Sequence, residues 1–213
     1  LDDTTMAVLR PVAPGENVVA ADEDAARGEV LLTGGRLLRE HDIAALAAVG
    51  MPDVEVSVGP RVGIISTGDE LVDVGAAPAP GQVRDMNSYA LHAAARLAGA
   101  RPEILGIVRD DYASLAQAMR DALGRVDMLI VSGGSSIGTR DFAREAIDSL
   151  GRPGVLVHGI AVKPGKPTII AVADGVPVFG LPGHPVSCLT VFRLLVEPAI
   201  ARWMGGRLMR REL

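Results

Sequence analysis

Between residues 61 and 203 the chain alternates short apolar runs with longer segments in which apolar residues recur at helical spacing. The short runs are rich in β-branched residues and predict strands, at 62–65, 104–108, 128–131, 155–157, 168–172 and 176–179. The longer segments predict helices, at 88–98, 112–123, 141–150 and 186–203. This alternation favours an α/β fold with a mostly parallel sheet that helices cover.

The predicted helices carry residues that commonly begin and end helices. Ser88 and Asp141 are candidate N-caps, because their side-chain oxygens can accept a hydrogen bond from the first helical turn. One of Asp110 and Asp111 is expected to cap the next helix, which leaves the other side chain free for another role. Pro198 lies inside the last predicted helix, and we expect that helix to kink or end there.

Residues 1–58 have a different pattern, with proline and glycine turns between short apolar stretches. They predict a strand at 5–12, a helix at 40–49 and a half-buried strand at 54–58, where valine alternates with polar residues. We therefore expect a small N-terminal appended subdomain at 1–58, followed by an α/β domain at 59–205.

Composition narrows the function classes. Apolar residues make up 48% of the chain but aromatic residues only 3%, so the core must consist mainly of alanine, valine, leucine and isoleucine. The net charge of −5 gives no electrostatic reason to expect nucleic acid as a partner. The single cysteine, Cys188, excludes an internal disulfide and a cysteine-rich metal site, and it suits a cytoplasmic protein. We expect no membrane span and no signal peptide, and the missing initiator methionine suggests a fragment.

Polar or glycine-rich loops follow several predicted strands, at 66–70, 109–111, 132–136 and 182–185. In an open parallel sheet, ligands bind beyond the carboxyl ends of the strands. We therefore expect these loops to open on one edge of the sheet and to form a single site.

The loop at 132–136, Ser-Gly-Gly-Ser-Ser, is typical of an anion-binding turn. Glycines allow the backbone to approach an anion closely and to point successive N–H groups at it. The alternative is a tight strand-to-helix turn that binds nothing. No Gly-Lys-Ser/Thr follows it and no GxGxxG motif follows a strand, so neither a Walker loop nor a dinucleotide site is indicated.

Three further segments carry candidate chemistry. Asp69 and Glu70 are adjacent acids that suit Mg²⁺ beside a phosphate, although a capping role for Asp69 and a solvated Glu70 remain equally open. The turn at 163–167, Lys-Pro-Gly-Lys-Pro, holds two cations on a stiff backbone that suits an oxyanion, or else is an ordinary exposed turn. The segment at 182–187 begins the last helix, where free N–H groups can receive an anion, and His184 there either donates to the substrate or caps the turn. The remaining histidines show no metal-ligand spacing, and Cys188 is expected in the core.

Taken together, four ordered motifs resemble the successive signatures of the MoeA/gephyrin E-domain family. They lie at 66–71, at 132–138 with Asp141, at 163–167 and at 181–187, and the upstream segment 10–17 resembles that family's return into its first domain. The resemblance implies a three-layer α/β molybdopterin-binding domain that is shared with MogA-type adenylyltransferases. It further implies that the family's second domain would precede this chain, and that 206–213 begins a truncated C-terminal domain.

The family resemblance also implies a reaction. Adenylyl-molybdopterin binds, molybdate joins its dithiolene, and the pyrophosphate link is hydrolysed to release AMP and molybdenum cofactor, with Mg²⁺ assisting. The implied catalytic residues are Glu70, Asp110, Asp141, Lys163 and Lys166, with Glu70 and Asp110 as metal ligands. The implied substrate-binding residues are Thr67, Gly68, Asp69, Ser132, Gly133, Gly134, Ser135, Ser136, Pro167, Pro182, Gly183, His184 and Ser187.

The expected partners follow from the same resemblance: adenylyl-molybdopterin and molybdate as substrates, a MogA-type adenylyltransferase, and a second copy in a homodimer of the intact protein. His184 departs from the asparagine that many relatives have at its position. Two other functions stay open, a MogA-like molybdopterin adenylyltransferase and a non-catalytic molybdopterin-binding or scaffold module. The lysine turn and the segment 181–187 favour the transferase over the adenylyltransferase.

Overall fold

The computed structural model describes residues 3–5, 7, 9–133 and 142–206 of the chain. It divides the chain into two compact units, Leu1–Val54 and Glu55–Leu213. In the described part of the first unit, the regular element is helix α1 (Glu40–Ala48), in the place where the sequence predicts a helix. The described residues of 5–12 and all of 54–58 form no strand, so both strand predictions in this region were wrong. Alternating valines make a strand only where a neighbouring strand supplies hydrogen bonds, and none is described beside them.

The second unit is built on a six-stranded sheet with the order β4-β1-β5-β8-β7-β6. Strands β4, β1, β5 and β8 are parallel, whereas β7 runs antiparallel to β8 and β6 antiparallel to β7. The expected mostly parallel sheet is therefore confirmed. The bounds are β1 (Arg61–Thr67), β4 (Arg101–Val108), β5 (Met128–Gly133), β6 (Pro153–His158), β7 (Ile169–Ala173) and β8 (Val176–Leu181).

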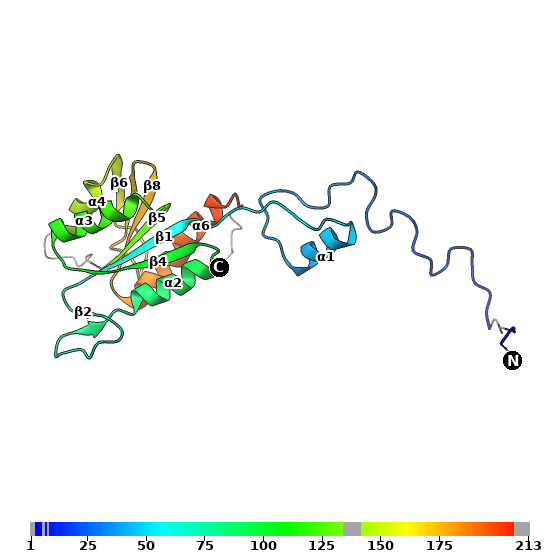
Figure 1. Cartoon of the computed structure of the whole chain (residues 1–213), viewed down its shortest axis with the longest axis horizontal. Helices are drawn as coiled ribbons and strands as arrows, with labels where there is room; N and C mark the ends of the chain where they lie inside the picture. The colour runs from blue at the N-terminus through cyan, green and yellow to red at the C-terminus, as the bar shows by residue number, and fades with distance from the viewer. Residues whose placement is uncertain (1–2, 6, 8, 134–141, 207–213) are drawn as a thin grey trace. The chain divides into compact units, whose positions relative to one another are not determined.

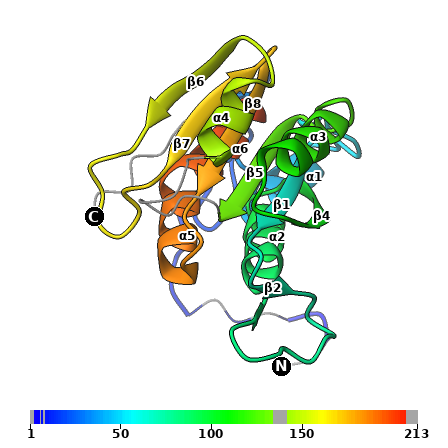
Figure 2. The same ribbon diagram turned by 90° about the vertical axis from the view of Figure 1, so that its left-hand side faces the viewer.

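Helices cover both faces of this sheet, as Figures 1 and 2 show. Helices α3 (Tyr112–Leu123) and α4 (Phe142–Asp148) pack on one face, and α2 (Asn87–Leu97) with the C-terminal helices packs on the other. Alternate residues of β5 enter the two cores: Leu129 and Val131 face α3 and α4, whereas Met128 and Ile130 face α2. The three-layer architecture implied by the family resemblance is thus confirmed.

The C-terminal helical segment differs from the expected single helix. It consists of α5 (Pro185–Val191), a π-helical turn η1 (Phe192–Val196) and α6 (Glu197–Trp203). Pro198 has no backbone N–H and its ring clashes with the carbonyl four residues earlier in a regular α-helix. The extra residue in the preceding π-turn relieves that clash, so the segment continues past Pro198 without ending. Phe192, Val196 and Ile200 remain fully buried against the sheet.

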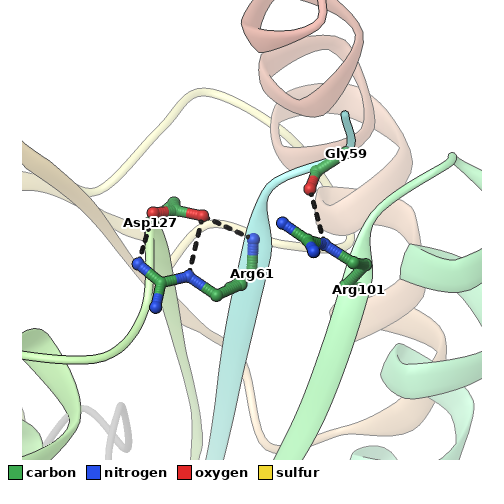
Figure 3. Close-up of polar contacts among 4 residues, drawn as sticks. All are labelled: Gly59, Arg61, Arg101 and Asp127. Carbon is green, nitrogen blue, oxygen red and sulfur yellow. Dashed lines mark hydrogen bonds and ion pairs between the residues drawn. The ribbon is translucent and has the colours of Figure 1, made fainter. Parts of the chain in front are cut away.

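An ion pair between Arg61 and Asp127 joins the starts of strands β1 and β5 (Figure 3). Asp127, just before β5, accepts hydrogen bonds from the Arg61 backbone nitrogen at 2.8 Å, from its Nε at 3.2 Å and from its Nη2 at 2.9 Å. Arg101, the first residue of β4, donates from Nε to the carbonyl of Gly59 at 3.1 Å. These contacts fix the starts of β1, β4 and β5 relative to one another.

Replacing Asp127 with asparagine is expected to lower the free energy of unfolding by about 1 kcal/mol at pH 7, since a half-exposed ion pair contributes modestly. The hydrogen bonds from Arg61 hold the pKa of the Asp127 carboxyl below its usual value of 3.8. The stabilisation is therefore present above about pH 4 and disappears as the pH falls through the lowered pKa. Urea unfolding between pH 7 and pH 3 should show the two proteins converging.

The matched control is Glu103→Gln, which removes a more exposed partner, 3.7 Å from Arg125, and should change stability little at any pH. A loss for Asp127→Asn that does not depend on pH would contradict the electrostatic origin of the effect.

Candidate functional site at the carboxyl edge of the sheet

The loops after β1 and β4 are hydrogen-bonded to each other at the carboxyl edge of the sheet. The register pairs Thr67 with Val108 on one side and with Gly133 on the other. The Thr67 hydroxyl lies 2.6 Å from Oδ1 of Asp110 and donates to it, and the Gly68 N–H donates to the Val108 carbonyl at 3.3 Å. The side chain of Asp110 is thereby held against the end of β1.

Asp110 and Asp111 have separate roles. Asp111 is the N-cap of α3, because its Oδ1 accepts a hydrogen bond from the Ser114 N–H at 2.9 Å. That bond holds the pKa of the Asp111 carboxyl below its usual range. Asp110 instead points toward Thr67, so Asp110 is the acid that the fold directs to the edge of the sheet.

The two acids of the loop after β1 are exposed and lie next to different neighbours. Oδ1 of Asp69 accepts a weak hydrogen bond from the Asp110 N–H at 3.4 Å. The Glu70 carboxylate packs over Gly68, where an added Cβ would lie 2.8 Å from Oε2 of Glu70. The backbone carbonyl of Glu70 accepts from the Val83 N–H at 2.9 Å, which ties this loop to a two-stranded sheet of β2 (Leu71–Val72) and β3 (Val83–Arg84). A hollow opens beside Asp69, and its lining consists of Gly68, Asp69, Leu71, Ile107, Val108 and Arg109.

The glycine-serine turn begins directly beside Thr67. Gly133 has a φ of +106°, and a Cβ there would lie 2.1 Å from the Thr67 carbonyl oxygen, so only glycine fits. Gly183, which follows β8, is in contact with the same turn, because its Cβ position lies 3.5 Å from the Cα of Gly133. The other predicted residues of this turn, Gly134, Ser135, Ser136 and Asp141, lie outside the described residues.

A cluster of buried polar side chains under this edge was missed by sequence reasoning. Nδ2 of Asn87 donates to Oγ of Ser132 at 2.9 Å and to the carbonyl of Gly183 at 2.7 Å. Ser88, predicted to be an N-cap, is instead fully buried inside α2 with its hydroxyl 2.8 Å from that of Ser66. Asp85 takes over the capping contact, since its Oδ1 accepts from the Ser88 N–H at 3.1 Å. The available signal was the presence of polar residues on the helix face that packs against strands.

The lysine turn lies at the same edge of the sheet, because β7 runs antiparallel and its first residue, Ile169, pairs with Gly180 near the end of β8. The turn is internally bonded: Oγ1 of Thr168 donates to the Gly165 carbonyl at 2.7 Å, and the Lys166 carbonyl accepts from the Ile160 N–H at 2.9 Å. Gly165 is buried with a φ of +126°, whereas Lys163 and Lys166 are exposed. Of the 21 lysine and arginine residues of the chain, these two alone are lysine.

The segment at 182–187 completes this edge of the sheet. His184 is the N-cap residue of α5, but its side chain makes no capping hydrogen bond, and Pro185 occupies the first turn. Pro182 is buried, His184 is exposed and Ser187 is half-buried. Burial raises the pKa of the Cys188 thiol to about 11, which fits the expected core residue. Pro167 is half-buried beside the lysine turn.

The acidic side chains at the carboxyl edge of the sheet could hold a metal ion only if a bound phosphorylated ligand supplied further oxygen atoms. Among the described residues, no group of three or more histidine, cysteine, aspartate or glutamate side chains is arranged to hold a metal. The Asp69 carboxylate accepts a hydrogen bond from the backbone N–H of Asp110, which joins the loops that carry these two acids. Mg²⁺ commonly takes one or two carboxylates and completes its coordination with phosphate oxygens and water, so this pair fits that ion beside a phosphorylated ligand.

Comparisons with a family model, with curated proteins and with solved structures all indicate the same family. A family model described as a probable molybdopterin binding domain matches residues 63–202. A molybdopterin molybdenumtransferase of Bacillus subtilis strain 168 is 38% identical over 199 residues, which cover 93% of this chain and 46% of that protein. The chain thus spans about half the length of the curated relatives it matches.

Solved structures agree in fold. A molybdopterin biosynthesis MoeA protein from Pyrococcus horikosii superposes with a TM-score of 0.79 at 42% identity, covering 92% of this chain and 48% of that one. A molybdenum cofactor biosynthesis protein B superposes with a TM-score of 0.54 at 20% identity over 70% of this chain and 96% of that one, a likeness of fold alone. Within the described residues, no helix combines the length and apolar character needed to cross a membrane.

Proposed function

Because the chain belongs to the family of molybdopterin-binding domains, we propose that it is the pterin-binding and catalytic part of a molybdopterin molybdenumtransferase. In the proposed reaction, molybdate forms two Mo–S bonds to the dithiolene of adenylyl-molybdopterin, and one of its oxygens leaves with two protons as water. Water then cleaves the phosphoanhydride link, so that AMP leaves and the pterin keeps its phosphate. The observation that carries this proposal is the meeting of acids, glycine turns and the chain's only two lysines at one edge of the sheet.

The division of labour follows from the chemistry of these side chains. The ammonium groups of Lys163 and Lys166 are exposed cations that attract molybdate or a phosphate and offset its charge as the phosphoanhydride breaks. The turns at Gly133 and Gly183 bring backbone within reach of the substrate, because neither carries a side chain. Glu70, in the loop after β1, and Asp110, in the loop after β4, assist the attacking water or its metal ion.

Mg²⁺ is the proposed cofactor, and when bound it supplies charge neutralisation to the pyrophosphate oxygens. Asp110 would hold it, with Asp69 or Glu70 from the neighbouring loop. The hydrogen bond from Thr67 occupies Oδ1 of Asp110 and so orients the carboxylate. The protein's part in metal binding is therefore orientation of a carboxylate by a strand-end hydroxyl.

The deciding experiment incubates the purified chain with adenylyl-molybdopterin and measures AMP release with and without molybdate. Release that depends on molybdate supports the proposal. Consumption of ATP with free molybdopterin would instead assign the chain to the adenylyltransferase class. Tight binding of pterin without either reaction would indicate a binding or scaffold module, or a need for the parts of the relatives that this chain does not span. Adding tungstate in place of molybdate tests oxyanion preference.

Replacing Asp110 with asparagine is expected to reduce molybdate-dependent AMP release on the order of tenfold to a hundredfold, the range for groups that orient a metal site. The paired control is Asp111→Asn, one residue away, because Asp111 caps α3 and does not contact Thr67. A higher Mg²⁺ concentration should partly restore Asp110→Asn. Equal activity losses in the two variants would contradict the assignment of Asp110 to the site.

The same proposal places the protein in the cytoplasm, as a homodimer when intact, and supplied with substrate by a MogA-type adenylyltransferase. Exposed apolar side chains at Met86, just before α2, and at Tyr89 and Leu97 on the helix suit contact with a second copy. Light scattering of the purified chain measures its oligomeric state directly, and a strictly monomeric mass would remove the dimer from the proposal for this chain.

A further inference from the structure

The side-chain amide of Asn87 is hydrogen-bonded both to Ser132, near the end of β5 where the glycine-serine turn begins, and to Gly183, in the turn after β8. It donates from Nδ2 to Oγ of Ser132 at 2.9 Å and to the carbonyl of Gly183 at 2.7 Å. We infer that Asn87 is a positioning residue that sets the spacing of these two turns and thereby the affinity for the phosphorylated substrate. The effect on substrate affinity rests on the proposed function, whereas the position of Asn87 between the two turns rests only on its hydrogen bonds.

The orientation of the amide follows from its partners. A backbone carbonyl only accepts hydrogen bonds, so the nitrogen of Asn87 must face Gly183. Ser132 accepts from the same nitrogen, and its hydroxyl also lies 3.7 Å from Sγ of Cys188. Asn87 is 9% exposed and Ser132 is 1% exposed, so water does not compete freely for these bonds.

Where the two segments approach each other, both residues are glycine, Gly133 and Gly183, so no side chain of either one sets their separation. Gly133 and Gly183 approach so closely that an added Cβ on Gly183 would lie 3.5 Å from the Cα of Gly133. Their separation therefore depends on where the backbone lies. Strands β5 and β8 set that position from within the sheet, and Asn87 sets it from the packed helix α2. A shift of one turn relative to the other would misplace N–H groups that must point at a common anion.

The helix that carries Asn87 is itself anchored away from the turns. The hydroxyls of Ser66 and Ser88 lie 2.8 Å apart, and Asp85 accepts from the Ser88 N–H. The first contact joins α2 to β1, the second lies at the start of α2, and neither involves Gly133 or Gly183. Ser88→Ala is therefore the matched control: it removes a buried hydrogen bond of the same helix and should lower stability comparably to Asn87→Ala without releasing the turns.

Two substitutions at Asn87 distinguish positioning from general stability. Asn87→Ala removes both hydrogen bonds at every pH. Asn87→Asp keeps the shape, but its carboxylate has no proton to donate and faces the Gly183 carbonyl. Lowering the pH protonates that carboxyl and restores one donor, so the defect of Asn87→Asp should shrink toward acid pH while that of Asn87→Ala stays constant.

The first measurement is amide hydrogen exchange by NMR on the full chain without ligand. Asn87→Ala should speed exchange at Gly133 and Gly183 well beyond its effect on the central residues of β1, whereas Ser88→Ala should affect both turns no more than the rest of the sheet. Uniform acceleration in both variants would show that Asn87 contributes only to overall stability, and the inference would be wrong.

The second measurement is the dissociation constant for adenylyl-molybdopterin between pH 5 and pH 8. We expect it to rise at least about tenfold for Asn87→Ala, the factor that 1.4 kcal/mol represents, and to remain within about twofold of the parent for Ser88→Ala. Equal affinity of the parent and Asn87→Ala would overturn the inference. If the parent itself fails to bind, the proposed function fails, and the exchange measurement still decides whether Asn87 holds the turns.

Discussion

Replacing Gly133 with alanine is expected to lower the free energy of unfolding by at least about 3 kcal/mol and to abolish binding of adenylyl-molybdopterin. The residue has a φ of +106°, a conformation that costs a side-chain-bearing residue about 1–3 kcal/mol. The new Cβ would also lie 2.1 Å from the Thr67 carbonyl, so β1 and β5 must move apart at the point where the site begins.

Gly81→Ala separates these two contributions. Gly81 also has a positive φ, +86°, but a Cβ there meets nothing within 4 Å, so only the backbone cost remains. We expect that control to lose about 1–2 kcal/mol and to bind the substrate normally. Chemical denaturation and equilibrium binding measure both quantities. A Gly133→Ala protein as stable as Gly81→Ala would mean that the turn tolerates a side chain and is not a close approach of backbone to backbone.

Removing both lysines of the turn is expected to reduce molybdate-dependent AMP release by about a thousandfold, the upper range for loss of groups that stabilise developing negative charge. Lys163 and Lys166 are exposed, and the turn is held by its backbone and by Thr168, so the fold should survive the change to alanine. Arg120→Ala, on the exposed side of α3, removes a cation elsewhere and should leave the rate unchanged. An unaffected rate in the double variant would remove the oxyanion role.

Arginine at 163 and 166 should restore little of this activity. A lysine ammonium is a compact point charge with rotatable donors, whereas a guanidinium is a broad planar fork. The chain uses arginine at every other basic position, which suggests that charge alone is not what these two positions require. Because they are the only lysines, amine acylation followed by mass spectrometry reports on them directly, apart from the N-terminus. Bound substrate should protect both from the reagent.

The layered fold and the edge that holds the site followed from the sequence because strand-ending loops in a parallel sheet must meet. The buried runs at 62–65, 128–131 and 176–179 were long enough and apolar enough to identify central strands. The antiparallel direction of β6 and β7 was not predicted, since a short buried run reads the same in either direction. That direction is nevertheless what brings the lysine turn to the edge shared by Thr67 and Gly133.

Other features lay beyond sequence reasoning for identifiable reasons. The cap role of Asp111 and the inward role of Asp110 depend on a backbone angle that adjacent aspartates do not reveal. Asn87 bonds to residues 45 and 96 positions away, and no local pattern reports such a contact. At 54–58 the local pattern is that of a strand, but the described residues contain no strand that pairs with it. The prediction of a strand there was therefore wrong.

The irregular pairing of β4 with β1 determines where Asp110 lies relative to Thr67. Ile104 pairs with Ile64 but Gly106 pairs with Ile65, so Leu105 is an additional residue, and Gly106 follows with a φ of +111°. If β4 kept all its residues but paired with β1 without this bulge, Ile107 would stand opposite Thr67, and Asp110 would lie about 3.3 Å past the hydroxyl that now holds it. The bulge at Leu105, and not the length of β4 alone, therefore sets the point at which Asp110 meets the end of β1.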